Sequence, residues 1–265
     1  MYPPGGKKME KEKIISVMKR YELKYLLNNE QLKHFMDRIS HHMKVDKYGV
    51  TSIASIYFDT PDYRLINKSI EKPKYKEKLR LRGYGLVAPD KPTFLEIKRK
   101  CEGIVYKRRI ALSEKEAFLL ISNKEAREKT QISRELEAFM EKYNVLEPKY
   151  LIIYDRIAYY QDNSDLRITV DMNPRYRIDD LNLHTSMDGY PLLEDGGAIL
   201  EVKVQHSVPL WLVKILTEEK IYQSSFSKVG NAHKREMANK VRKEIIPINK
   251  TEMITKGGLN YGVTI

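Results

Sequence analysis

Several segments of this chain alternate charged and apolar residues. The clearest is Lys78-Leu79-Arg80-Leu81-Arg82. The same alternation recurs at residues 22–25, 95–98, 107–110, 167–171 and 200–204. Because successive side chains of a β-strand point to opposite faces, each segment places its charges on one face and its Leu, Ile or Val residues on the other. The pattern predicts an antiparallel sheet with one apolar face and one charged face.

Apolar residues spaced three and four positions apart predict five helices between or after these strands. We expect Asn29 to cap the first, and Ser113 with Glu116 forms a capping box before the second. The other three are expected at residues 136–143, at 210–216 with Pro209 in the first turn, and at 227–241. Their apolar stripes are expected to face the core.

The pattern predicts one folded domain between two tails. Residues 1–13 read MYPPGGKKMEKEK, without periodicity, and are predicted to form a flexible N-terminal tail. Residues 247–265 are rich in turn residues and are predicted to form a C-terminal tail. Residues 14–246 contain no linker and no internal repeat, so we expect a single domain there.

The predicted charged face carries more cations than carboxylates. The whole chain has 48 Lys and Arg against 36 Asp and Glu, a net charge of +12. Such a surface repels itself unless an anion occupies it, which indicates a partner that is a nucleic acid, an anionic lipid, a nucleotide or a polymeric phosphate. The cations are Lys24, Lys78, Arg80, Arg82, Lys98, Lys107, Arg109, Arg167 and Lys203, and the carboxylates are Glu22, Glu96, Asp171 and Glu201.

Two arrangements of the sheet are compatible with this pattern. If the sheet closes into a barrel with its apolar residues outward against the helices, the charged faces converge on a lumen. If it stays open, the charges form a solvated face. We predict the first, an α+β fold in which an antiparallel β-barrel is surrounded by packed helices, and the open charged sheet is the alternative.

Several classes of site are not supported by the sequence. A single cysteine, Cys101, excludes an intramolecular disulfide framework and cysteine-rich zinc sites and fits a reducing compartment, so a cytoplasmic location is expected. No apolar run reaches the length of a transmembrane segment. No phosphate-binding loop is present, because Gly83-Tyr84-Gly85 lacks a third glycine. The six histidines show no metal-ligand spacing.

Side chains of the charged face must therefore bind any phosphate. Lys and Arg on several strands can surround a linear polyphosphate and donate charge-assisted hydrogen bonds to it. The interleaved carboxylates Glu22, Glu96, Asp171 and Glu201 suit Mg²⁺ or Mn²⁺, which take one or a few carboxylates together with phosphate oxygens and water. A metal beside a cationic clamp is the equipment of phosphoryl transfer. From the residues alone, nucleic-acid binding stays open.

The chain resembles the VTC polyphosphate polymerase domain of the triphosphate tunnel metalloenzymes, a group related to CYTH proteins. The resemblance extends from about Lys19 to Lys234. It rests on these motifs in this order: Arg20-x-Glu22-x-Lys24-Tyr25, Ser55-x-Tyr57-Phe58-Asp59-Thr60, Lys78-x-Arg80-x-Arg82-x-Tyr84, Phe94-Leu95-Glu96-x-Lys98, Lys107-x-Arg109, Tyr154-x-Arg156, Leu166-Arg167-Ile168-Thr169-x-Asp171, Leu200-Glu201-Val202-Lys203 and Phe226-Ser227-Lys228.

The resemblance implies a basic β-tunnel that binds ATP or another triphosphate and inorganic polyphosphate, and that transfers the ATP γ-phosphoryl group to a growing chain with Mn²⁺ or Mg²⁺. It implies Glu201 as the main metal ligand, and it does not favour nucleic acid as a partner. Two positions depart from related signatures, Arg20 in place of Glu and Ser225 in place of a basic residue. The expected catalytic residues are Lys78, Arg80, Arg82, Arg156 and Arg167, and the expected phosphate-binding residues are Lys24, Lys98, Lys107, Arg109, Lys203, Ser227 and Lys228.

Two alternatives to the polymerase use the same residues. One is a hydrolase of triphosphate or polyphosphate, with water as the acceptor. The other is a non-catalytic polyphosphate-binding module. The resemblance covers no membrane segment, so coupling to a membrane would require a separate membrane-protein partner.

Overall fold

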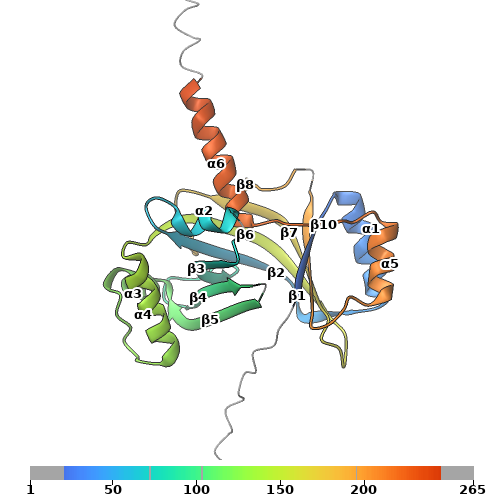
Figure 1. The fold of residues 1–265 in the computed structure, drawn as a ribbon, viewed down its shortest axis with the longest axis horizontal. Helices are drawn as coiled ribbons and strands as arrows, with labels where there is room; N and C mark the ends of the chain where they lie inside the picture. Colours follow the sequence, from blue (N-terminus) through green and yellow to red (C-terminus); the bar gives the residue numbers. More distant parts are fainter. Residues whose placement is uncertain (1–20, 72, 103, 195, 246–265) are drawn as a thin grey trace, which may run out of the picture.

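The computed structural model describes residues 21–71, 73–102, 104–194 and 196–245 (Figure 1). Ten strands form one antiparallel sheet in the order β10-β1-β9-β7-β6-β2-β3-β4-β5, and β8 pairs with β7. The strands are β1 Tyr21–Leu27, β2 Lys44–Asp59, β3 Tyr75–Tyr84, β4 Pro92–Cys101, β5 Ile104–Ser113, β6 Glu147–Tyr160, β7 Arg167–Arg177, β8 Tyr190–Pro191, β9 Ala198–Val204 and β10 Gln223–Ser224. The helices are α1 Asn29–Ser40, α2 Arg64–Ile70, α3 Glu114–Asn123, α4 Gln131–Tyr143, α5 Leu210–Glu218 and α6 Lys228–Ile245.

The alternation of charged and apolar residues produces the two faces of this sheet. On β3, Leu79 and Leu81 are fully buried, whereas Lys78 and Arg80 lie on the opposite face. Alternate residues of β4, β7, β9 and β1 divide in the same way. The predicted α+β class with a large antiparallel sheet and packed helices is confirmed.

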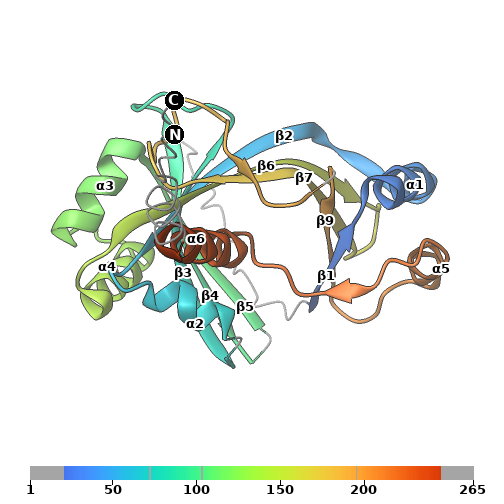
Figure 2. The ribbon, with the colours of Figure 1, turned by 90° about the horizontal axis from the view of Figure 1, so that it is seen from above.

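Two pairs of helices cover the apolar face of the sheet, as Figure 2 shows from above. Helices α3 and α4 pack on β2 to β6 through residues such as Ala117 and Phe139. Helices α1 and α5 pack on β1, β9, β7 and the end of β6 through residues such as Phe35 and Leu212. The ends of the sheet thus have separate cores, each closed by its own pair of helices.

Helices α2 and α6 lie on the other side, on the face that carries the charges. Val229 and Ala232 of α6 and Ile66 of α2 pack against Tyr150 and Ile152 of β6. Part of the charged face is therefore apolar and covered, and the first turn of α6 begins beside the uncovered part. The predicted barrel placed the helices against its apolar face. This prediction is wrong for α6, which packs on the charged face.

The helix boundaries agree with most of the predicted signals. The capping box of Ser113 and Glu116 is confirmed at the start of α3. The cap of α1 is Asn28 rather than Asn29, because the Asn28 side chain accepts from the Gln31 N–H. Helix α2 was not predicted. It begins where the buried Asp59 carboxylate accepts from the backbone N–H groups of Leu65 and Ile66.

The sheet curls but does not close. Within the described part of the chain, β5 pairs only with β4 and β10 pairs only with β1, so the expected barrel has a seam between these edges. The edge strand β10 has two residues, too few to form a ladder along β5. The predicted tails at 1–13 and 247–265 lie outside the described residues. None of the described helices has the length and apolarity needed to cross a membrane.

Candidate functional site

Charged side chains from opposite ends of the sheet meet in its interior. The ammonium of Lys98 on β4 lies 3.3 Å from the carboxylate of Glu22 on β1, although five strands lie between β1 and β4 in the sheet order. Lys78 of β3 donates to the Ser227 hydroxyl at 3.0 Å, just before α6. We call the cations gathered here the cation bed: Lys24, Lys78, Arg80, Arg82, Lys98, Lys107, Arg156, Lys203 and Lys228.

Glu96 lies at the centre of the first cluster in the bed. Its carboxylate has no exposed surface and accepts from Arg80 at 2.7–2.8 Å, while Lys107 lies 2.6 Å away and Arg82 3.8 Å away. Burial would raise the pKa of Glu96, but Arg80, Arg82 and Lys107 hold it at about 2. Glu96 therefore stays ionised at neutral pH and fixes the positions of three cations.

Asp171 organises a second cluster where β6 meets β7. Arg156 donates to both of its carboxylate oxygens, at 2.6 and 2.8 Å, and Lys228 from the start of α6 pairs with the same group. Burial opposes ionisation, yet Lys228 and Arg156 hold the pKa of Asp171 at about 2. This bidentate pair fixes the plane of the Arg156 guanidinium.

Glu201 differs from Glu96 and Asp171 because the described cations that pair with it are all lysines. Lys203 lies 2.8 Å away and Lys24 lies 3.7 Å away. Burial would raise the pKa of Glu201, but Lys203 and Lys24 keep it well below the usual value. Its neighbour across the ladder is Thr169, whose buried hydroxyl has no hydrogen-bond partner in the structure. Lysines are flexible point charges that can turn toward an incoming phosphate.

The structure does not gather the four carboxylates that were expected to bind metal into one cluster of three or more among the described residues. Glu22, Glu96, Asp171 and Glu201 each pair with their own cations, and no cluster of three or more His, Cys, Asp or Glu suited to a metal occurs among the described residues. A hard cation can still be held by one carboxylate with phosphate oxygens and water. Glu201 fits that role best, since its partners are lysines and the hydroxyl of Thr169 beside it is free.

Two tyrosines contact arginines of the cation bed, and no role was predicted for either, although both stand in the motifs quoted above. Arg80 donates to the Tyr57 hydroxyl at 3.1 Å, and Arg82 donates to the Tyr154 hydroxyl at 3.3 Å. The ammonium of Lys228 lies 4.3 Å from the centre of the Tyr154 ring. The sequence contains a signal for Tyr154: it stands two residues before Arg156 in a strand, so the two side chains lie on the same face.

The pKa values of Lys78 in the bed and of Tyr57 beside it are also shifted far from their usual values. Burial, together with the nearby cations Lys24 and Lys98, lowers the pKa of Lys78 to about 7. Burial would raise the pKa of Tyr57, but the positive charges of Arg80 and Lys78 outweigh it and lower the pKa to about 7. Burial is thus the main cause of the shift at Lys78, and the surrounding positive charge is the cause of the lowered pKa of Tyr57.

These two shifts predict that the ligand-free protein becomes more stable as the pH rises from about 7 to about 10. In this interval unfolded Lys78 and Tyr57 bind protons that the folded protein has released, so the free energy of unfolding increases with pH, by roughly 1 kcal/mol or more. Urea unfolding at pH 7 and pH 9.5 measures the change. The Lys78→Met variant should show a smaller rise, and a falling curve in the wild type would contradict the prediction.

Arg109 and Arg167, two further expected site residues, lie away from the centre of the bed. Arg109 is exposed on β5, and its guanidinium lies 4.7 Å from the centre of the Phe94 ring. Arg167, at the start of β7, is exposed and donates to the carbonyls of Ser164 and Leu166. Arg167 lies on the same face of β7 as Thr169 and Asp171, as the alternation predicts. The alternation does not show that its side chain is exposed rather than buried in the bed.

Solved structures with a similar course of the chain share little sequence with this protein. A Bacillus halodurans structure provisionally named an adenylate cyclase has 16% identity and a TM-score of 0.48, covering 79% of this chain and 96% of its own. A Vibrio parahaemolyticus structure with the same provisional name has 12% identity and a TM-score of 0.45, covering 82% and 99%. A Pyrococcus horikoshii protein has 13% identity and a TM-score of 0.40, covering 81% and 99%.

The comparison by sequence family is more informative. No match to this sequence is found among curated proteins. The model of the VTC domain, however, matches residues 19–235, which include every described strand, helices α1 to α5 and the first eight residues of α6. The resemblance drawn from the ordered motifs is confirmed, and the chain belongs to the VTC domain family.

Proposed function

We propose that this protein is a metal-dependent phosphoryltransferase that makes inorganic polyphosphate from ATP within the cation bed. The observation that carries the proposal is the convergence of cations from β1, β3, β4, β5, β6, β9 and the start of α6 on one interior volume. A row of phosphates is the ligand that such a volume can contact from several sides at once.

The buried carboxylates orient the cations in this proposal. Glu96 and Asp171 are ionised at neutral pH, so neither can serve as a general acid there. They hold Arg80 and Arg156 in fixed directions before the substrate arrives, which lowers the cost of organising charge around a transferring phosphoryl group. Arg80, Arg82 and Arg156 would neutralise the transferring and leaving phosphates, and Lys78, Lys98 and Lys228 would bind the rest of the chain.

A divalent metal would be held by Glu201 together with phosphate oxygens of the substrate. Mn²⁺ or Mg²⁺ in this position would neutralise charge on those oxygens. Around it, Lys24 and Lys203 would exchange their contacts with Glu201 for contacts with phosphate. Of the four carboxylates proposed from the sequence, we propose only Glu201 as the main ligand.

Incubation with ATP and either Mn²⁺ or Mg²⁺ tests the proposal. We expect ADP to accumulate together with a ladder of phosphate chains on a polyacrylamide gel. Release of free phosphate without chain extension would instead identify the hydrolase. Binding of tripolyphosphate without any turnover, in the presence of either metal, would identify a binding module and contradict the proposal that the protein is an enzyme.

A further inference from the structure

An aromatic platform lies where the cation bed reaches the end of the β3–β4 hairpin. The rings of Tyr84 and Phe94 meet edge to face with centroids 6.1 Å apart. The Arg109 guanidinium lies over the Phe94 ring at 4.7 Å. Tyr84 is 45% exposed and Arg109 is exposed as well, so the platform is open to solvent. The proposed phosphoryl transfer does not use the two rings.

The platform directly continues the row of arginines. On β3, Tyr84 follows Arg80 and Arg82 at alternate positions and therefore lies on the same face. On β4, Phe94 is the residue paired with Arg82 across the ladder, and it precedes Glu96 on the same face. A ligand whose phosphates contact Arg80 and Arg82 thus has the next group of its structure beside the two rings.

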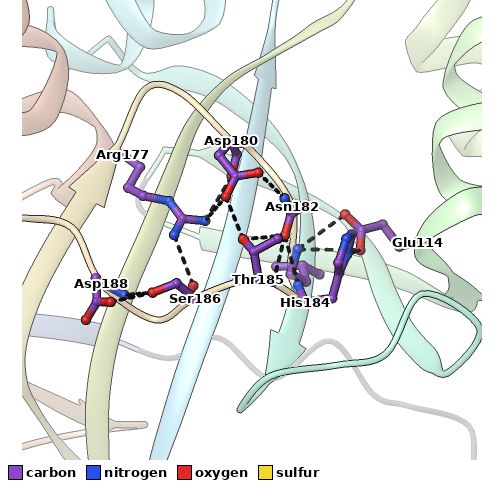
Figure 3. Close-up of polar contacts among 9 residues, drawn as sticks. Glu114, Arg177, Asp180, Asn182, His184, Thr185, Ser186 and Asp188 are labelled. Carbon is purple, nitrogen blue, oxygen red and sulfur yellow. Dashed lines mark hydrogen bonds and ion pairs between the residues drawn. The ribbon is translucent and has the colours of Figure 1, made fainter.

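The hairpin that carries the platform is anchored from behind. Gly85 donates to the Ser52 carbonyl at 2.8 Å, and Val87 donates to the Leu183 carbonyl at 2.9 Å. Leu183 is 1% exposed, and its own N–H donates to the Glu114 carboxylate at 3.2 Å. The loop that contains it, residues 178–189, is tied together by side-chain hydrogen bonds. Figure 3 shows the contacts of this loop with Glu114 and Arg177.

The chemistry of the platform favours a heterocyclic ring over a further phosphate. Phe94 has no hydrogen-bond donor, and the faces of both rings carry negative quadrupole charge, so a polyphosphate chain gains little from them. A flat aromatic base gains stacking energy on such rings whichever polar groups it carries, because every base has a π-face. A guanidinium held over a ring is itself a flat group on which a base can stack.

We propose that Tyr84, Phe94 and Arg109 form the stacking site for the nucleobase of the nucleoside triphosphate. This inference rests on the proposed function, because it concerns the substrate of the same bed. It sets the direction of the substrate: the nucleoside lies at the β3–β4 hairpin, and the terminal phosphate points toward Lys78, Ser227 and Lys228. It also implies that the protein distinguishes ATP from inorganic tripolyphosphate.

Titration calorimetry with two ligands, ATP and tripolyphosphate, tests the inference. We expect Tyr84→Ala and Phe94→Leu each to weaken ATP binding by about tenfold. Tripolyphosphate binding should stay within about twofold of the wild type, because it places no base on the rings. Tyr84→Phe keeps the ring and should bind ATP like the wild type. Thermal unfolding of each variant checks that it remains folded.

Tyr48 provides a matched control for the lost ring. It is 70% exposed and has the Lys47 ammonium 5.0 Å from its ring centre, so Tyr48→Ala removes a comparable exposed ring and should leave the binding of both ligands unchanged. Equal weakening of both ligands in the platform variants, or unchanged ATP binding, would overturn the stacking site. The proposed function fails separately, if wild-type protein binds ATP but forms neither ADP nor chains. If wild-type protein binds neither ligand, both proposals are wrong.

Discussion

Replacing Glu96 with Gln is expected to lower the free energy of unfolding of the ligand-free protein by about 3–5 kcal/mol. The carboxylate is completely buried among Arg80, Arg82 and Lys107, and removing it leaves three cations in one enclosed volume without their shared anion. Denaturant unfolding of the wild type and of Glu96→Gln measures the loss. The effect should be much larger than the loss for an exposed ion pair of the same charges.

Tripolyphosphate should recover a large part of this lost stability. A bound anion supplies negative charge to the cations that Glu96 no longer neutralises, and any ligand that binds only the folded state stabilises it. Glu77→Gln is the matched control. Glu77 is also buried beside cations, with Arg99 at 3.0 Å and Lys142 at 2.6 Å, but it lies on the opposite face of β3. If the ligand restores both variants equally, the cation bed is not where it binds.

Replacing Glu201 with Gln is expected to reduce turnover of ATP by about 100-fold or more, which corresponds to about 2.7 kcal/mol of activation free energy. The change keeps the shape of the side chain and removes the charge that would hold the metal beside the phosphates. Binding of tripolyphosphate should change little, because Lys24 and Lys203 are then released from their carboxylate partner. Parallel measurements of ADP release and of ligand affinity separate the two effects.

Glu135→Gln serves as the control for Glu201. Glu135 pairs with Arg99 and Arg108 on the outer side of the sheet, so its loss removes the same charge without touching the bed. Turnover should remain near the wild-type level. If Glu201→Gln retains full turnover, Glu201 is not the metal ligand. If it loses tripolyphosphate binding as completely as turnover, the carboxylate acts on the ligand rather than on the reaction.

The charged face could be read from the sequence because its signal is local. Strand side chains alternate with a period of two, so Leu79 and Leu81 in the core fix Lys78, Arg80 and Arg82 on the opposite face without any knowledge of the fold. The ordered motifs then identified the family. Even the ion pair between Lys98 and Glu22, which joins distant strands, follows from the expectation that these faces converge.

What the sequence could not supply depends on contacts between distant segments. The apolar stripe of α6 was readable, but nothing local shows that Val229 and Ala232 pack on the charged side of β6. The pairing of the carboxylates with cations had the same origin. Glu96 and Asp171 look like metal ligands in a linear sequence, and only the folded chain places Arg80 against one and Arg156 against the other. Whether the sheet closes depends on how far it curls, which no single strand encodes.

The seam in the curled sheet has a mechanical consequence. Across it, in the part of the chain that the structure describes, β4 and β1 are joined by the ion pair of Lys98 and Glu22, whose side chains are 32% and 18% exposed, and not by a main-chain ladder. Parting such a contact costs far less than breaking a row of backbone hydrogen bonds. The enclosure is therefore held at this seam by side chains, and we expect it to part more easily there than along the ladders of the sheet.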